Sequence, residues 1–576
     1  MVIGETMKQL WKTFYYLKKY KKWTFFGIFL IFLEVLMELT MPNIMSNMIN
    51  QGIGNHDFQY IAWNVVLMIV LTVVGVLGGI GSTYFAAKAS GYVNEDMRDA
   101  LFRKICSLSY VRFDQMKVGN LITVLTNDIT TIGNIIMMSL RILLRVPVLF
   151  LGSIIMAILI SPKLSLILIV LLPIMVFFLT HILRKAFPYF DLTQQATDEV
   201  NRVVRENVGG IRVVKANSNE SFEKKKFDTV NKELKEVNLK AIYLVISAMP
   251  VLMLVINFAI LIVLWYGGVH VMEGTFAIGN IMAFIQYLTN ILSSVMMGSV
   301  MIVMLARSCT SAIRFQTWMD MEEEQELGTL EQSIQGKIEF CNVSFTYEQG
   351  TGDAVLKDIN IVIEPNQLIG IVGPTGSGKT TFAELLMRNY LPTQGEIYLD
   401  DVNIQCWKQE SLKTQMAMNF QKVTLFKGTV KENLALSGIS EEDEIWKVSK
   451  ISCAYEFLKK NKEGLDYLLE QKGTNLSGGQ KQRLALTRTL LQHPKILILD
   501  DSTSAIDAKT ERQIIENLKQ YQKGTTILIS NKISTVKDCD QILVFDDGAL
   551  VATGRHEQLQ QENEFYRMIV ETQQKR

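Results

Sequence analysis

The sequence is poor in the residues that build metal sites and disulfide frameworks. Its 576 residues include six cysteines and five histidines; no C-x-x-C pair occurs, and the histidines do not cluster with the cysteines. This composition argues against a zinc site. The formal net charge is +1, so whole-chain electrostatics favour no nucleic-acid partner.

Lysine and arginine are almost missing from three short segments. Residues 51–60 and 267–277 have none, and the turn near Pro162 carries only Lys163. These segments separate apolar runs, each about as long as the ~20 residues that cross a bilayer as a helix. The six predicted membrane spans are residues 23–49, 61–87, 132–160, 164–182, 245–266 and 278–305.

The two long segments between spans are basic instead. Residues 88–129 and 183–240 carry many lysines and arginines, so the positive-inside rule places both segments, and both chain ends, in the cytoplasm. Both are rich in helix formers, and we expect membrane helices to continue into them as helical pairs. None of the six cysteines then lies outside, which argues against structural disulfides.

Two pairs of charges lie within predicted spans. Glu34 and Glu38 are one turn apart and share a helix face. The functional interpretation is a contact for a cationic substrate or a gating pair; the structural interpretation is a pair bonded to neighbouring helices, or Glu38 near the outer interface. Arg141 and Arg145 have the same spacing near the inner end of the third span, where snorkelling of the side chains is the simpler interpretation.

Methionines crowd the sixth span. Methionine is soft and adaptable, which suits a promiscuous pocket, but it is also an ordinary packing residue. A substrate pocket and helix packing therefore both remain open for Met296, Met297, Met301 and Met304.

Composition changes after the sixth span. An acidic, polar stretch is followed from Ile338 by short β-like runs that alternate with helical ones, which is typical of an α/β domain. We predict an all-α six-helix transmembrane domain over residues 1–320, a linker over 321–336 and an α/β nucleotide-binding domain over 337–576.

A phosphate-binding loop is the strongest motif. The buried strand 368–372 precedes a G-x-x-x-x-G-K-T run, and a helix follows from Thr381. Glycines let backbone N–H groups curl round phosphate, Lys379 reaches the β and γ phosphates, and Thr380 binds Mg²⁺. The predicted ATP-binding residues here are Gly373, Pro374, Thr375, Gly376, Ser377, Gly378, Lys379, Thr380 and Thr381.

A second apolar strand, residues 496–499, ends in Asp500 and Asp501. An apolar strand that ends in aspartate after a phosphate-binding loop is the Walker B pattern, in which Asp500 holds Mg²⁺ through water. The predicted cofactors are therefore ATP and Mg²⁺.

Further motifs resemble the ATP-binding cassette (ABC) exporters over essentially the whole chain. The run Leu476, Ser477, Gly478, Gly479, Gln480 is similar to their signature motif, which contacts ATP held by a partner cassette. The resemblance implies that Tyr347 stacks on adenine and that Gln421 contacts Mg²⁺ and the membrane domain. Residues Ser504 to Asp507 resemble the D-loop.

Two positions depart from the family pattern. The family's catalytic glutamate is replaced by Asp501, whose shorter side chain can miss the attacking water. Its switch histidine is replaced by Asn531, which cannot carry a proton as histidine can. With an intact signature, this pattern predicts a heterodimer in which a second half-transporter carries the complete catalytic site; a homodimer with two slow sites is the alternative.

The resemblance implies ATP-driven efflux of hydrophobic or amphipathic compounds, as in multidrug-type bacterial exporters. A dedicated peptide or lipid exporter and a regulatory, non-transporting subunit are the alternatives. We expect a multi-pass protein of a bacterial plasma membrane, with the lipid bilayer and a small amphipathic substrate as its further partners.

Overall fold

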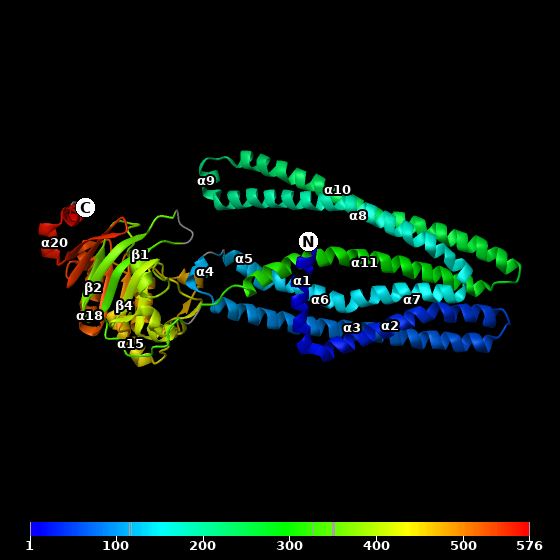
Figure 1. Cartoon of the computed structure of the whole chain (residues 1–576), viewed down its shortest axis with the longest axis horizontal. Helices are drawn as coiled ribbons and strands as arrows, with labels where there is room; N and C mark the ends of the chain where they lie inside the picture. The colour runs from blue at the N-terminus through cyan, green and yellow to red at the C-terminus, as the bar shows by residue number, and fades with distance from the viewer. Residues whose placement is uncertain (1, 115, 117, 325–326, 348–351, 575–576) are drawn as a thin grey trace. The chain divides into compact units, whose positions relative to one another are not determined.

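The chain divides into two compact units (Figure 1). The structure, a computed structural model, describes residues 2–114, 116, 118–324, 327–347 and 352–574. One unit comprises residues 1–106 and 118–321, and the other comprises 107–117 and 322–576. The short segment 107–117, which interrupts the helical half of the chain, therefore packs with the second unit.

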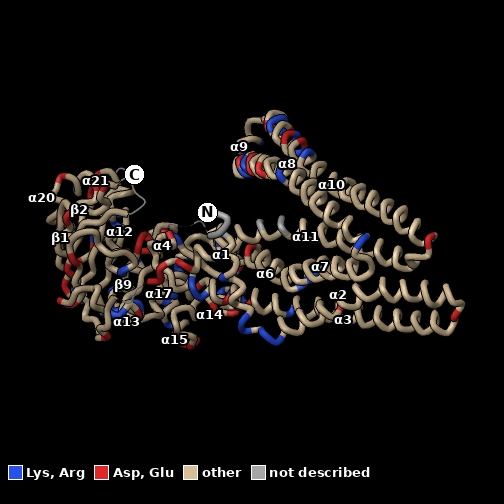
Figure 2. Tube along the Cα trace, turned by 45° about the vertical axis from the view of Figure 1, so that its right-hand side comes forward, with Lys and Arg blue, Asp and Glu red and all other residues tan. Residues whose placement is uncertain are grey.

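The first unit is helical. Within the described residues, six helices are long and apolar enough to cross a membrane, which confirms the six predicted spans. Charged residues are sparse along these helices and gather near α9 (Figure 2). The elements are α1 (Val2–Phe14), α2 (Lys21–Asn47), α3 (Phe58–Cys106), α5 (Val118–Thr123), η3 (Val124–Asp128), α6 (Ile129–Met138), η4 (Ser139–Leu143), α7 (Leu144–Ile160), α8 (Pro162–Gly209), α9 (Ile211–Ala216), α10 (Glu220–Met272) and α11 (Ile278–Met319).

The core of the first unit joins α2, α7, α8, α10 and α11. Leu39, Phe284 and Tyr287 are buried in it together with leucines of α7 and α8. The Tyr287 hydroxyl donates a hydrogen bond of 2.8 Å to the Leu39 carbonyl, so its polar tip is satisfied inside the apolar cluster. This contact ties the first membrane helix to the sixth.

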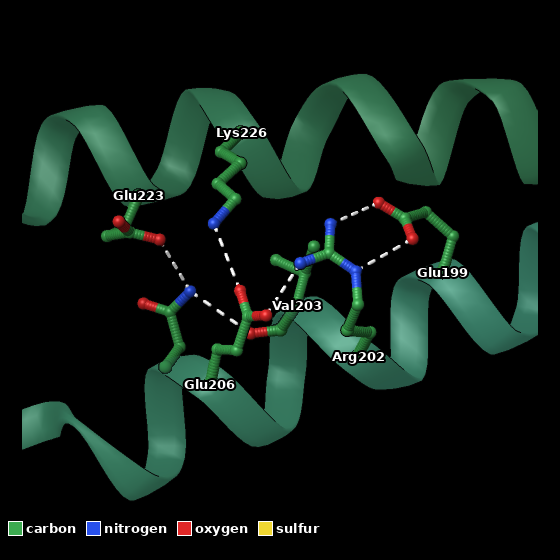
Figure 3. Close-up of polar contacts among 7 residues, drawn as sticks. Glu199, Arg202, Val203, Glu206, Glu223 and Lys226 are labelled. Atoms are coloured by element: carbon green, nitrogen blue, oxygen red, sulfur yellow. Dashed lines mark hydrogen bonds and ion pairs between the residues drawn. The ribbon is translucent and has the colours of Figure 1, made fainter.

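Helices α8 and α10 form a long hairpin whose tip is α9. The halves nearer α9 stand apart from the other helices of this unit (Figure 1). Polar bonds between the two helices close the hairpin there (Figure 3): Lys226 donates to Glu206 at 3.2 Å, and Asn207 donates to Glu223 at 2.7 Å. Arg202 adds a 2.6 Å bond to Glu206 along α8.

The second unit is an α/β domain with α4 (Tyr110–Asp114) packed against it. Its strands are β1 (Ile338–Phe345), β2 (Leu356–Ile363), β3 (Leu368–Val372), β4 (Gln394–Leu399), β5 (Val402–Asn403), β6 (Met416–Asn419), β7 (Gly428–Thr429), β8 (Leu468–Leu469), β9 (Ile496–Asp500), β10 (Thr525–Ile529), β11 (Gln541–Asp546) and β12 (Ala549–Gly554). Its helices are α12 (Lys379–Leu386), α13 (Gln409–Gln415), α14 (Val430–Ala435), α15 (Glu442–Ile451), α16 (Tyr455–Lys460), α17 (Gly478–Leu490), α18 (Ala508–Tyr521), α19 (Ile533–Val536), α20 (His556–Glu562) and α21 (Glu564–Gln574).

The larger sheet of this unit has the strand order β12-β11-β3-β10-β9-β6 in the described residues. The pairs β11–β3, β3–β10, β10–β9 and β9–β6 are all parallel. Parallel strands end at the same edge, which is where α/β sheets place ligand sites. The segments after β3, β6, β9 and β10 therefore meet at one edge. The combination of six membrane helices and an α/β domain confirms the predicted fold class.

A buried ion pair joins α11 to the π-helical turn η3. Asp128 is 3% exposed and accepts hydrogen bonds from the Ser311 hydroxyl at 2.8 Å and from Arg314 Nε at 2.7 Å. A carboxylate this deeply buried is stable when a cation and hydrogen-bond donors surround it. Arg314 therefore secures the packing of the last membrane helix against η3.

We predict that Arg314→Gln destabilises the protein by roughly 2–4 kcal/mol, because it leaves the Asp128 carboxylate buried without its cation. Thermal unfolding of the purified protein in detergent measures the change. Arg202→Gln, which removes the solvent-exposed pairs of α8, is the matched control and should lower the melting temperature much less. Equal shifts for the two variants would contradict the structural role of Asp128.

Candidate functional site

The phosphate-binding loop follows β3 and leads into α12, as its sequence pattern predicts. Gly378 has a φ of +95°, and a Cβ there would lie 2.6 Å from Leu356 Cδ2 and 2.9 Å from the Val355 carbonyl oxygen. Glycine is therefore required at this position both for backbone conformation and for space. The loop, residues 373–378, delivers Lys379 and Thr380 to the first turn of α12.

Lys379 lies inside this loop and is 8% exposed. Its Nζ donates hydrogen bonds to the carbonyls of Gly373, at 2.8 Å, and Pro374, at 2.6 Å. Burial lowers the pKa of Lys379, while the nearby Asp500 and Asp501 carboxylates oppose that shift. A buried ammonium beside a helix N-terminus is suited to bind a phosphate group.

Thr380 and Asp500 are brought together at the edge of the sheet. The Thr380 hydroxyl donates a 2.8 Å hydrogen bond to Asp500 Oδ2. Burial raises the pKa of Asp500, and the Asp501 charge adds to this, while the Thr380 bond and Lys379 oppose it. Gln421 follows β6, and its Nε2 is 3.4 Å from Asp501 Oδ2. The hydroxyl, carboxylate and amide oxygens of this group fit the ligand preference of Mg²⁺.

Tyr347 lies beside the phosphate-binding loop. Its hydroxyl is 3.1 Å from the Thr381 hydroxyl, and its ring meets those of Phe345 and Tyr390 edge to face, at 4.8 and 5.2 Å between centroids. A cavity of about 220 Å³ is lined by Tyr347, Gly376, residues 353–355 before β2 and the β11–β12 turn, residues 547–548. An aromatic ring fixed at the wall of such a cavity is suited to contact a flat base.

The two departures from the family pattern meet at the same edge. Asp501 has a φ of +45°, and its N–H donates to the Ile529 carbonyl at 2.9 Å. Asn531 comes after β10, is exposed, and accepts a 2.6 Å bond on its carbonyl from Gln573 Nε2. The fold therefore presents a short carboxylate and an amide at the two positions where the resemblance implies a glutamate and a histidine.

The signature segment forms the start of α17. Ser477 caps the helix: its hydroxyl accepts from the Gln480 N–H at 3.3 Å, and the Gln480 side chain accepts from the Ser477 N–H at 2.9 Å. Ser477 and Gly478 are exposed. Within the described residues, no hydrogen bond joins this segment to the phosphate-binding loop of the same chain.

Gln482, which has no counterpart among the predicted site residues, connects the signature helix to the D-loop. Its amide donates to the Ser504 hydroxyl at 2.9 Å and accepts from the Ala505 N–H at 2.9 Å. A Cβ on Gly479 would lie 2.9 Å from the Ala505 carbonyl oxygen, so glycine permits the close approach. Asp507 ends this loop by capping α18 through the Thr510 N–H, and that bond lowers the pKa of Asp507.

Two further residues that hold the loop after β10 could not be predicted from the sequence, because their hydrogen-bond partners are distant in the chain. Buried Glu511 accepts hydrogen bonds from Thr535 at 2.9 Å and Lys532 at 3.2 Å. Gln573 of α21 binds both sides of the loop after β10, at the Asn531 carbonyl and at the Ile533 N–H, 2.9 Å away. Neither residue has a sequence pattern that would have identified it.

In the first unit, the structure corrects the interpretation of Arg145. Its guanidinium forms an ion pair with Glu34 and a 2.7 Å hydrogen bond with Glu38 Oε2, so Arg145 does not snorkel. Glu34 and Glu38 do share a face, and the structure brings them to one guanidinium.

The methionines of α11 separate into two environments. Met297, Met301 and Met304 line a cavity of about 140 Å³ with Met138. Met296 packs against the apolar core shared with α7, α8 and α10. The cavity is consistent with either of the two interpretations of these methionines.

A six-helix membrane unit followed by a phosphate-loop α/β domain defines a class of membrane transporters coupled to an ATPase. The family model described as the ABC transporter transmembrane region matches residues 24–296, and the model described as ABC transporter matches residues 356–504. This chain belongs to the ABC transporter family and is an exporter half-transporter.

Known relatives match it over nearly full length. It is 38% identical over 565 residues to the uncharacterized ABC transporter ATP-binding protein YfiB of Bacillus subtilis, covering 98% of both chains. It is 33% identical to the ATP-dependent lipid A-core flippase of Pseudomonas fluorescens, covering 88% of this chain and 85% of the other. The structure of a bacterial Atm1-family ABC exporter with ATP bound superposes with a TM-score of 0.82 at 21% identity, covering 96% and 98%.

We predict that Tyr347→Ala weakens ATP binding roughly tenfold or more, because stacking of a base on an aromatic side chain contributes about 1–3 kcal/mol. Titration with a fluorescent ATP analogue measures the dissociation constant. Tyr347→Phe is the control: it keeps the ring, loses the bond to Thr381, and should bind ATP within about threefold of the parent. An unchanged affinity in Tyr347→Ala would rule out the stacking role.

Proposed function

We propose that this chain is one subunit of a heterodimeric, ATP-driven exporter of hydrophobic or amphipathic compounds, of the multidrug type. Residues 1–320 form the membrane domain, 321–336 the linker and 337–576 the ATP-binding cassette. The carrying observation is the contrast between an intact nucleotide-binding surface and two substituted positions, Asp501 and Asn531.

Each part of the cassette has a role in this proposal. Tyr347 stacks on adenine, and residues 373–381 wrap the phosphates, with Lys379 on the β and γ groups. Thr380, Asp500 and Gln421 would hold Mg²⁺, which when bound neutralises phosphate charge. In this proposal the site binds ATP but hydrolyses it slowly. Asp501 has a shorter side chain than the family's glutamate, and Asn531 has no imidazole to place at the phosphate.

The signature segment serves a second cassette. Exporters of this family act as dimers. Ser477 caps α17, and Ser477 and Gly478 are exposed, so this segment is available to ATP held by the partner. With Ser504 and Asp507 nearby, this chain completes a catalytic site whose glutamate and histidine the partner supplies.

Exposed valines among the charged residues at the tip of the α8–α10 hairpin also favour a partner chain. Around α9, Val208 is 68% exposed and Val213 is 66% exposed, beside a cavity of about 340 Å³. A soluble tip would be expected to carry polar residues at these positions, whereas a docking surface needs apolar ones. We assign this tip to contact with the second subunit.

Transport in this proposal is alternating access. ATP binds the closed pair of cassettes more tightly than the open pair, so binding shifts the population toward closure and changes the side to which the membrane cavity opens. Hydrolysis at the partner's complete site reverses the shift. In this proposal the chain lies in a bacterial plasma membrane with both ends in the cytoplasm, which the distribution of basic residues supports.

A dedicated lipid exporter is the second candidate. It is favoured by the relatives named lipid A-core flippases, such as the protein of Pseudomonas fluorescens at 33% identity. Reconstitution into vesicles separates the two: a broad set of dyes moved uphill supports the multidrug function, and movement confined to a labelled lipid supports the flippase.

The asymmetry is tested by ATPase rates of this chain purified alone and together with the half-transporter encoded beside it. We expect slow turnover alone and a rise of about 100-fold in the pair, because a misplaced catalytic group costs about that factor. In this chain, Asp501→Glu with Asn531→His should raise turnover of the chain alone. Ser477→Arg should abolish most turnover of the pair, because it blocks the partner's site.

Lys532→Arg, next to Asn531 and equal in charge, is the matched control for the double variant. Brisk ATPase activity by the unmodified chain alone, unaffected by restoring Glu and His, would show a homodimer with two working sites.

A further inference from the structure

A pocket of about 520 Å³ lies between α2 and α3 in the membrane-spanning part of the first unit. Its charged lining is Glu34 and Glu38 from α2 and Arg141 from η4, and Thr72 and Thr83 of α3 add two hydroxyls. Its apolar walls include Met37, Leu71, Val76 and Ile80. Charged groups in a bilayer are costly and are retained where they serve packing or a ligand.

Arg145 can neutralise one of the two carboxylates but not both. It bonds to Glu34 and, at 2.7 Å, to Glu38. The three groups together therefore carry one excess negative charge. The Glu34 and Arg145 side chains are 17% and 22% exposed, whereas the Glu38 side chain is 35% exposed. Glu38 is therefore the carboxylate that a ligand can reach most easily. Glu34 Oε2 is buried without a hydrogen-bond partner in the described structure.

Arg141 brings a positive charge to the same pocket. Its Nε is buried without a partner, and no ion pair to it occurs among the described residues. It lies on η4, a π-helical turn, and such turns in α-helices frequently mark functional sites. The pocket thus has one guanidinium without a carboxylate and one carboxylate charge without a cation.

Two glycines of α3, Gly75 and Gly79, line the pocket and differ in what an added Cβ would meet. A Cβ on Gly79 would lie 3.1 Å from Glu34 Oε2 and 3.2 Å from its Cδ, so a larger residue there would push on the carboxylate. At Gly75, which also lines the pocket, an added Cβ would meet Met37 Cβ at an ordinary 3.6 Å. Glycine at position 79 therefore permits the close approach of α3 to the Glu34 carboxylate.

We propose that this pocket binds the headgroup of a zwitterionic amphipath, with an acidic and an amino group, as the polar part of the exported cargo. Arg141 receives the acidic group through paired N–H donors, and the open Glu38 carboxylate receives the amine. The apolar walls accept the start of the acyl chain. This assignment of substrate class rests on the proposed export of amphipathic compounds.

Charge complementarity selects this occupant over two simpler ones. A purely anionic headgroup would pair with Arg141 but lie against the excess carboxylate charge. A lipophilic cation would pair with Glu38 but leave the Arg141 guanidinium desolvated without a partner. A zwitterion satisfies both groups at once, which is the condition for burying charges without a large penalty.

The test is a binding titration by native mass spectrometry on the purified transporter without ATP. The probes are lysophosphatidylethanolamine, lysophosphatidylglycerol and an alkyltrimethylammonium salt with the same chain length. We expect the zwitterionic probe to bind about tenfold or more tightly than either other probe, the range of one charge-assisted hydrogen bond. Equal binding of the three probes would overturn the proposal.

Variants locate the site. Arg141→Gln and Glu38→Gln should each weaken the zwitterionic probe about tenfold, whereas Arg141→Lys, which keeps the charge but loses the paired donors, should weaken it less than Arg141→Gln does. Arg141→Lys also shows that a loss in Arg141→Gln is not misfolding. Gly79→Ala should weaken binding more than Gly75→Ala, and Lys163→Gln, in the turn before α8, is the control outside the pocket.

An unchanged affinity in Arg141→Gln would overturn the assignment of the site. The proposed export function has its own test. It is contradicted if vesicles show no ATP-driven movement of any amphipath, even where the zwitterionic probe binds preferentially. Conversely, uphill transport with no charge preference in binding removes the zwitterion assignment alone.

Discussion

The parallel pairing of β3, β10, β9 and β6 is the constraint on which the nucleotide-binding unit depends. Four segments far apart in sequence end at one edge of the sheet because parallel strands share a direction. Asp500 is the last residue of β9, and Lys379, Gln421 and Asn531 follow their strands within a short loop. Their proximity is a property of strand order rather than of the side chains themselves.

In the proposed heterodimer, this division between scaffold and side chain lets the chain keep nucleotide binding while hydrolysis at its own site is reduced. Asp501 and Asn531 occupy positions that the backbone defines, so substituting them changes the chemistry of the edge without disturbing β9 or β10. The signature helix α17 has its own capping bonds and its own support from Gln482. In the proposed heterodimer, this chain can therefore bind ATP and supply its signature segment to the partner's site even where its own ATP hydrolysis is weak.

In the membrane unit the corresponding constraint is the cost of charge in an apolar medium. Asp128 is fully provided with donors from Ser311 and Arg314, which is the pattern of a structural pair. The group around Arg145 is different, because Glu34 and Glu38 share one guanidinium while Arg141 lines the same pocket without an ion pair among the described residues. The difference between satisfied and unsatisfied charge separates a packing contact from a candidate binding pocket.

Local patterns in the sequence determined the six apolar helices, the phosphate-binding loop after β3, the aspartate that ends β9 and the substitutions at Asp501 and Asn531. Each depends on hydropathy, glycine conformation or spacing over a few residues, which are short-range properties. Only the tertiary structure decided that Arg145 pairs with Glu34 and Glu38 and that Gln482 and Gln573 hold their loops. Those contacts join residues that are distant in sequence, and a polar side chain takes whichever partner the fold brings within hydrogen-bond reach.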